Sequence, residues 1–272
     1  MMKIYIIADM EGIAGVVSPD QISGNSWEYD LARKQFNAEV CAVCSGAIEG
    51  GAEEIYVNDF HGNGRNLDPV LLPQQVMLVR GEFRPCSGFD HLDNTFAGLI
   101  LLGAHARSGS RDAVIPHTYN PDIRFELYGQ PVGEFDLLAL LAGEMKVPTL
   151  LISGDAKTIE QAHTNLPATA TVITKFGLTG QSAVCLHPKA ICEMLREETK
   201  RAMQAASTLE PPMISPPVQL LVKLTNVSTA ERLDWIPGLK RVDELTYEFM
   251  GETMVEVMKL VYGVTTLVSA KF

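Results

Sequence analysis

The stretch KIYIIADMEGIAG, residues 3–15, begins as an apolar run and ends on two carboxylates, Asp9 and Glu11, only two positions apart. The Ile-rich run is typical of a buried strand closed by polar residues. Two carboxylates held so close repel each other, which favours a proton on one of them or a cation beside them. We therefore predict a buried strand over residues 3–9 whose carboxyl end carries a charged site.

Further apolar runs of strand length alternate with helical patterns along the first part of the chain. The predicted strands are 53–59, 97–105 and 147–155, the predicted helices are 28–50 and 133–145, and 124–132 is a hairpin turning at Gly129. Strand–helix alternation with nearly all-apolar strands is the pattern of a mostly parallel sheet. The predicted fold class is therefore α/β, with a mostly parallel sheet covered by helices on both faces.

The last hundred residues show a different pattern. A charged helix over 187–208 is followed by a proline-rich, extended connection over 211–217, two strands at 218–224 and 241–250, and a closing helix at 251–266. Proline lacks the backbone donor that a helix or a central strand needs, so 211–217 separates two regions. We predict a catalytic α/β domain over 1–157 and a smaller C-terminal α/β domain over 158–272.

Composition limits the class of protein. The 272 residues carry a formal net charge of -11, which argues against nucleic acid or an anionic membrane as a bulk partner. Five cysteines are an odd number, in a chain large enough to need no disulfides, and this suits a reducing compartment. The N-terminus is a poor signal peptide, and no run reaches the ~18 apolar residues of a membrane span. We expect a soluble cytoplasmic protein.

Side chains suited to metal binding follow three successive predicted strands. Asp9 and Glu11 follow the first, the segment VNDFHGNG delivers Asp59 and His61 after the second, and LLGAHARSG delivers His105 after the third. Ligands bind beyond the carboxyl ends of parallel strands, where these residues converge if the strands are neighbours. His nitrogens and carboxylate oxygens are zinc ligands. With Glu134, which opens the predicted helix 133–145, they make a candidate site for one or two Zn²⁺ ions.

Each of these residues also has an ordinary structural role. An Asp at a strand end is commonly a turn residue or a helix cap, and Glu134 suits a helix N-terminus because of the helix dipole. The coincidence of three strand ends favours the metal site, which manganese or cobalt would suit as well. His117, in the segment AVIPHTYNP, is either a general acid or base beside the metal site or a surface turn residue.

The remaining motifs indicate no competing chemistry. Cys41 and Cys44 form a CxxC inside a helix rather than at its N-terminus, where redox motifs lie. No G-x-S-x-G elbow is present, which removes the simplest serine hydrolase interpretation. His91, His163 and His187 are interpreted as surface or capping residues.

Five blocks of the sequence resemble one family of enzymes. KIYIIADMEGIAGVV, VNDFHGNGRNL, DNTFAGLILLGAHARSG, PVGEFDLLALLAGEMKVPTLLISGD and GQSAVCLHPKA are similar to segments of the zinc-dependent D-aminopeptidases. The resemblance extends over nearly the whole chain. It implies a binuclear zinc aminopeptidase that removes the N-terminal residue, such as D-Ala, from short peptides or amides.

The resemblance also implies roles for single residues. Asp9, Glu11, His61, His105 and Glu134 fall on the family's two-zinc centre, with Asp9 bridging the metals. His117 falls on its catalytic histidine, as an acid or base, an oxyanion stabiliser or a nucleophile. The loop before it is slightly longer here, and IPHTYN departs from the sequence of the founding member, which bears on substrate preference.

At the level of assembly, the resemblance implies a homo-oligomeric ring, a decamer of two stacked pentamers that admits short peptides. Two other functions remain open from the residues alone. One is another binuclear metal-dependent amidohydrolase that acts on a different small amide. The second is a small-ligand or metal-binding protein on the same scaffold, without turnover.

Overall fold

The computed structural model describes residues 1–24, 26–82, 84 and 89–270. Its larger sheet has seven strands in the order β3-β2-β1-β4-β7-β8-β9, and all neighbours are parallel except the β8–β9 pair. These strands are β1 (Lys3–Ala8), β2 (Glu54–Asp59), β3 (Val76–Val79), β4 (Gly98–Ala104), β7 (Thr149–Asp155), β8 (Ala170–Thr179) and β9 (Ser182–Cys185). The predicted mostly parallel α/β sheet is confirmed.

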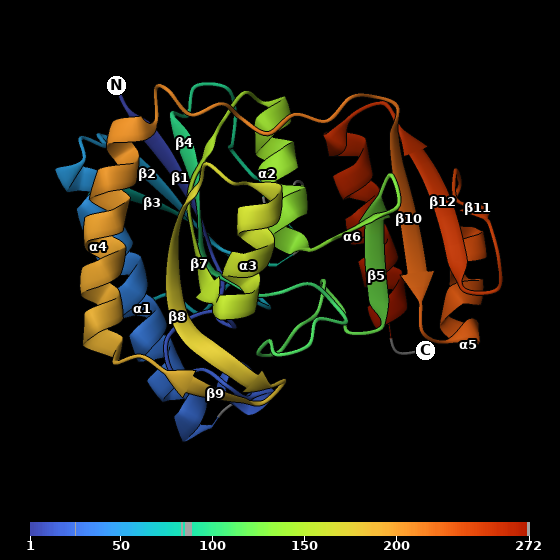
Figure 1. Cartoon of the computed structure of the whole chain (residues 1–272), viewed down its shortest axis with the longest axis horizontal. Helices are drawn as coiled ribbons and strands as arrows, with labels where there is room; N and C mark the ends of the chain where they lie inside the picture. The colour runs from blue at the N-terminus through green and yellow to red at the C-terminus, as the bar shows by residue number, and fades with distance from the viewer. Residues whose placement is uncertain (25, 83, 85–88, 271–272) are drawn as a thin grey trace.

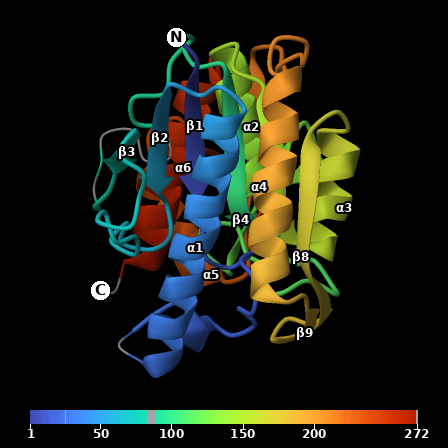
Figure 2. The same cartoon turned by 90° about the vertical axis from the view of Figure 1, so that its left-hand side faces the viewer.

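Strand β1 shows that both faces of this sheet are covered. Ile4 and Ile6 belong to a core shared with the helices α1 (Trp27–Glu49) and α4 (Pro188–Ala205), which lie side by side in Figure 2. The alternate residues Tyr5 and Ile7 belong to a second core on the opposite face. That face is covered by α2 (Glu134–Glu144) and α3 (Ala156–Asn165), as Figure 1 shows. A strand buried on both faces explains the uninterrupted apolar run in the sequence.

A second sheet has five antiparallel strands in the order β11-β12-β10-β5-β6. They are β5 (Ile123–Leu127), β6 (Gln130–Val132), β10 (Val218–Leu224), β11 (Lys240–Arg241) and β12 (Thr246–Gly251). The short helix α5 (Val227–Ala230) and the 3₁₀ turns at Pro19–Gln21 and Glu231–Trp235 complete the elements of the described chain.

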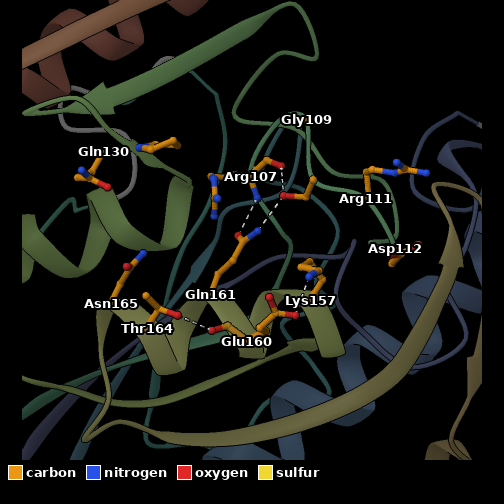
Figure 3. A pocket seen from close by; sticks show the side chains of 12 residues that line it. Arg107, Gly109, Arg111, Asp112, Gln130, Lys157, Glu160, Gln161, Thr164 and Asn165 are labelled. Atoms are coloured by element: carbon orange, nitrogen blue, oxygen red, sulfur yellow. Dashed lines mark hydrogen bonds and ion pairs between the residues drawn. The ribbon is translucent and has the colours of Figure 1, made fainter.

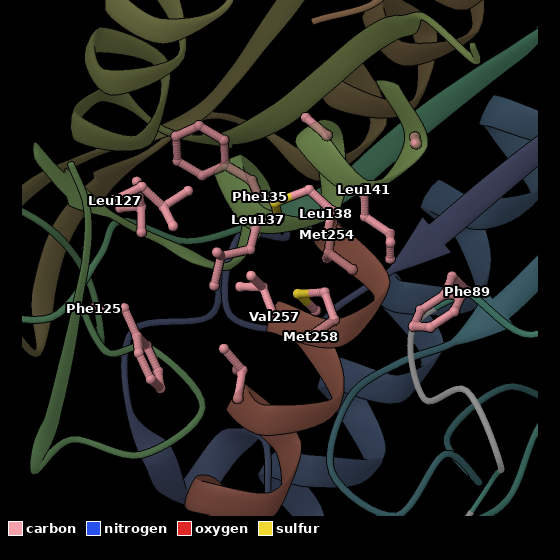
Figure 4. Packing of buried hydrophobic residues seen from close by; sticks show 14 of the residues in the cluster. Phe89, Phe125, Leu127, Phe135, Leu137, Leu138, Leu141, Met254, Val257 and Met258 are labelled. Carbon is pink, nitrogen blue, oxygen red and sulfur yellow. The ribbon is translucent and has the colours of Figure 1, made fainter. Parts of the chain in front are cut away.

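The last helix, α6 (Met254–Ser269), lies between α2 and this second sheet (Figure 1). Figure 4 shows Leu137 of α2 and Val257 of α6 in the same apolar cluster as Phe125 of β5. Close packing of this kind fixes α6 against α2 and the second sheet. The C-terminal helix is therefore held near residues from the first half of the chain.

Membership of the two sheets does not follow the order of the chain. The predicted hairpin 124–132 forms as β5 and β6, with Gly129 at φ +74°, and pairs with β10 in the second sheet. Strands β8 and β9, which follow residue 157, complete the larger sheet. The division into domains 1–157 and 158–272 stays a prediction.

Two predicted elements of the C-terminal region have different bounds. The predicted strand 241–250 is divided into β11 and β12, because a turn intervenes in which the Asp243 side chain accepts the Leu245 N–H at 2.9 Å. Helix α6 begins at Met254 rather than at 251, since Thr253 caps it by accepting the Glu256 N–H. None of the helices in the described residues is both long and apolar enough to cross a membrane.

Candidate functional site

The candidate site lies at the carboxyl edge of the larger sheet. Strand β1 is the central member of the parallel trio β2-β1-β4. Asp9 follows β1, His61 lies two residues beyond β2, and His105 follows β4. The predicted convergence of three strand ends is confirmed, and Glu134 is brought to the same place as the first residue of α2.

Two glycines let the loop after β1 pack directly on the end of β4. A Cβ at Gly12 would lie 2.0 Å from the Ala104 carbonyl oxygen, and a Cβ at Gly103 would lie 2.1 Å from that of Asp9. Gly103 also has φ +70°, a conformation that glycine adopts at little cost. Asp9 and Glu11 are thereby held next to the strand that delivers His105.

The predicted metal ligands form two groups that share one residue. His61 Nδ1 lies 3.0 Å from both Asp9 Oδ1 and Glu11 Oε2. His105 Nε2 lies 3.2 Å from Glu134 Oε1 and 3.6 Å from Asp9 Oδ2. Within the trio Asp9, Glu11 and His61, and within the trio Asp9, His105 and Glu134, the potential ligand atoms lie within 4.8 Å of one another. Asp9 thus stands between two possible metal positions.

Each of the three histidines has one ring nitrogen close to a backbone carbonyl. His61 Nε2 lies 2.7 Å from the Ile22 oxygen, His105 Nδ1 lies 3.2 Å from that of Ala106, and His117 Nδ1 lies 2.9 Å from that of Ile115. Since a carbonyl only accepts, that nitrogen carries the proton, and the other nitrogen faces the carboxylates. Metal-binding histidines are oriented in this way.

His105 and His117 occupy the centre of the cluster. Their rings stack with centroids 4.0 Å apart and an interplanar angle of 8°. His117 Nε2 lies 3.7 Å from Glu11 Oε1 and 3.9 Å from Glu134 Oε1. His105 Nε2 is buried and makes no hydrogen bond with the described residues. A buried nitrogen that faces carboxylates without a hydrogen bond fits a metal ligand.

The charged groups of the cluster shift one another's pKa values. Burial, together with Glu11, raises the pKa of Asp9 to about 7. Burial also opposes ionisation of His105, but Glu134 and the other carboxylates more than offset it and raise its pKa to about 10. Burial and the neighbouring His105 lower the pKa of His117. Three buried carboxylates thus favour positive charge beside them, which protonated histidines or a cation can supply.

Two buried ionisable side chains hydrogen-bond to the backbone of the loop that carries Asp9 and Glu11. The Lys175 ammonium of β8 donates to the carbonyl oxygens of Glu11 at 2.5 Å and Ile13 at 2.7 Å. Glu39 of α1 accepts the Ala14 N–H at 2.8 Å, and both side chains are fully buried. We interpret them as positioning residues that set where the Glu11 carboxylate lies.

Asp59 has a structural role. Its carboxylate accepts hydrogen bonds from the backbone N–H groups of Asn66 and Leu67, at 2.6 and 2.8 Å, and from the Asn66 side chain. The Asn66 amide also donates to the His61 carbonyl, so Asp59 stabilises the turn that carries His61. Of the other histidines, His187 caps α4, as predicted.

A cavity of about 280 Å³ opens onto the cluster. It is lined by five of the predicted site residues, Asp9, Glu11, His61, His117 and Glu134, and also by Phe60, Gly62, Tyr119, Tyr262 and Thr265. Sequence reasoning missed Lys175, Glu39, Tyr262 and Thr265, which reach the site only through tertiary packing. Tyr119 had a local signal, since it follows His117 by two residues.

A larger cavity of about 460 Å³ lies between α3 and the loop after His105 (Figure 3). Gln161 accepts the Arg107 N–H and donates to Ser110, whose hydroxyl donates to the Arg107 carbonyl. None of the predicted metal-binding residues lines this cavity. The hydrogen bonds among its lining residues instead stabilise the segment between His105 and His117.

Comparisons with known proteins find similar sequences and a similar fold over nearly the whole chain. A family model named Peptidase_M55 and described as D-aminopeptidase matches residues 2–262. The D-aminopeptidase of Bacillus subtilis (strain 168) is 30% identical over 270 residues, which cover 98% of this chain and 97% of that protein. A solved structure of the "Zn-dependent D-aminopeptidase DppA from Bacillus subtilis, a self-compartmentalizing protease" has a TM-score of 0.95 and 28% identity, with 100% of each chain covered.

Proposed function

Since the chain belongs to the Peptidase_M55 family of D-aminopeptidases, we propose that it is a binuclear zinc aminopeptidase acting on short peptides or amides. The proposed reaction releases the N-terminal residue, and the proposed configuration of that residue is D, as in D-Ala. The observation that carries the proposal is the pair of ligand trios that share Asp9. One acidic residue between two such groups suits two metal ions close together.

We assign one zinc ion to Asp9, Glu11 and His61, and the second to Asp9, His105 and Glu134. Bound zinc supplies Lewis acidity to a substrate carbonyl and lowers the pKa of water. The carboxylates on this edge also attract the protonated N-terminal amine of a peptide, which directs that end of the substrate to the cluster.

His117 is the proposed catalytic residue. The Ile115 carbonyl accepts a hydrogen bond from Nδ1, so the proton of the neutral ring lies on Nδ1. Nε2 is then free to accept a proton and lies near Glu11 and Glu134. In the proposed reaction, Nε2 exchanges a proton with the leaving amine. Its lowered pKa leaves it neutral and able to accept a proton at neutral pH. Nucleophilic attack by Nε2 is the alternative role for the same atom.

The proposed assembly is a homo-oligomeric ring in the cytoplasm, a decamer of two stacked pentamers. The solved structure at 28% identity is of a protein described as self-compartmentalizing, and the two folds agree over the full length of both chains. A ring that encloses its active sites admits short peptides and excludes folded proteins.

The test is a substrate panel with the zinc-loaded protein. We expect hydrolysis of D-alanyl-D-alanine and D-alaninamide, with kcat/KM for the L-isomers lower by a factor of ten or more. Release of free alanine, measured by chromatography, gives the rates. Preference for L-isomers contradicts the proposed stereochemistry alone, hydrolysis of other small amides only favours a different amidohydrolase, and zinc binding without turnover favours a binding protein.

A further inference from the structure

Three hydroxyl-bearing side chains line the cavity beside the candidate metal-binding residues. We call Tyr119, Tyr262 and Thr265 the hydroxyl wall. Tyr119 belongs to the loop that carries His117, whereas Tyr262 and Thr265 lie three positions apart on one side of α6. Residues far apart in the sequence thus bring three hydroxyl-bearing side chains to one cavity.

The hydroxyl oxygens of this wall are buried, and none has a partner in good hydrogen-bond geometry among the described residues. The Tyr119 and Tyr262 rings pack edge to face, with their centroids 5.3 Å apart. Even if these two hydroxyls share one hydrogen bond, one of them and Thr265 keep a donor without an acceptor. Buried polar groups are normally paired, so several unpaired hydroxyls on a ligand cavity indicate that the ligand supplies the acceptor.

The rest of the cavity limits what this acceptor can be. The described lining residues include no lysine or arginine, so the wall itself is uncharged. Phe60 adds an apolar surface, and its ring packs edge to face with that of Tyr119, with the ring centroids 6.3 Å apart. A neutral carbonyl oxygen is accommodated by such a wall more readily than a group that needs a buried counter-charge.

We propose that the hydroxyl wall binds the backbone carbonyl of the residue that leaves, and so selects peptides over simple amino-acid amides. The proposal rests on the proposed aminopeptidase function. The amine and the reacting carbonyl of the N-terminal residue face the charged cluster, and an alanine side chain needs no hydrogen bond. The carbonyl of the next residue is the polar group that remains to be satisfied.

This assignment gives α6 a part in substrate selection. The metal-binding residues come from the larger sheet and from α2, whereas Tyr262 and Thr265 come from the helix packed between α2 and the second sheet. The C-terminal region then contributes to specificity without contributing a proposed metal ligand.

The experiment compares Tyr262→Phe and Thr265→Val with the parent on two substrates. The first is D-alanyl-D-alaninamide, whose second residue carries a neutral amide carbonyl, and the second is D-alaninamide, whose leaving group is ammonia and has no carbonyl. Loss of one hydrogen bond is expected to lower kcat/KM for D-alanyl-D-alaninamide about tenfold, mainly through KM, and to change kcat/KM for D-alaninamide less than about twofold. Zinc content per chain is expected to be unchanged.

Tyr247→Phe is the matched control, because Tyr247 lies on β12, where its hydroxyl donates to Asp234, and does not line the cavity. Equal losses on both substrates, or no loss on either, overturn the hydroxyl wall as the site for the leaving residue. A parent that binds zinc but hydrolyses neither substrate overturns the proposed function itself, and with it this inference. Activity in the parent therefore distinguishes failure of the hydroxyl-wall proposal from failure of the proposed aminopeptidase function.

Discussion

Replacing His117 by alanine is expected to lower kcat by a factor of roughly 10² to 10⁴, the usual contribution of a positioned acid or base. The variant should still bind zinc, because each of the two assigned sites keeps all three of its protein ligands. The imidazole also stacks on His105, so the structure of the variant needs confirmation by circular dichroism. The measurement is kcat on D-alanyl-D-alanine, together with zinc per chain.

The control for this variant is His163→Ala. His163 is an exposed residue of α3 that contacts the Thr171 hydroxyl at 3.1 Å, and its loss should leave kcat unchanged. A His117→Ala protein that loses zinc together with activity identifies His117 as a ligand, consistent with its place in a third trio with Glu11 and His105. Full activity in the variant excludes any catalytic role.

Replacing Lys175 by methionine is expected to lower the free energy of unfolding by roughly 3–6 kcal/mol, since two buried hydrogen bonds from a charged donor are lost, each worth about 1.5–3 kcal/mol. The change removes the donor to the carbonyls of Glu11 and Ile13 and the cation whose field favours ionisation of Glu39. Denaturant unfolding of the parent and the variant measures the loss.

A second change tests whether the loss comes from charge. Glu39→Gln keeps an oxygen to accept the Ala14 N–H while removing the buried charge, so it should recover part of the stability lost in Lys175→Met. Additive losses in the double variant contradict coupling between the two residues.

The pH dependence gives an independent check on Lys175. Burial lowers its pKa from 10.5 to about 8 in the folded chain. Between these values the unfolded chain binds more protons, so the free energy of unfolding rises with pH in the parent. The Lys175→Met variant should lack this part of the rise, and identical slopes in both proteins contradict a buried lysine.

The sequence was sufficient to predict that the candidate metal-binding side chains meet, because each strand end has its own local signal in the sequence. An apolar run followed by Asp9 indicates a strand end, and parallel neighbours bring His61 and His105 to the same edge. This prediction required only that the three strands share one edge of the sheet, and it required no distance between the side chains. The role of each residue in binding metal stays a proposal.

The surroundings of the cluster could not be predicted in the same way. Strand β8 carries Lys175 and pairs with β7, yet its segment ATVITKFGLT mixes apolar and polar residues and lacks a continuous apolar run. In the sequence, Tyr262 is indistinguishable from the other apolar positions of the last helix. Its place at the site depends on how α6 packs against α2, which the sequence does not show. Contacts across so many residues leave no local pattern.

The central claim is that five side chains hold two zinc ions, with Asp9 common to both. Metal content per chain after exhaustive dialysis, measured for the parent and for Asp9→Ala, tests it most directly. We predict two zinc ions per chain in the parent and a marked loss in the variant, since each assigned site loses a ligand. A parent without stoichiometric zinc, or an Asp9→Ala protein that retains both ions, contradicts the claim.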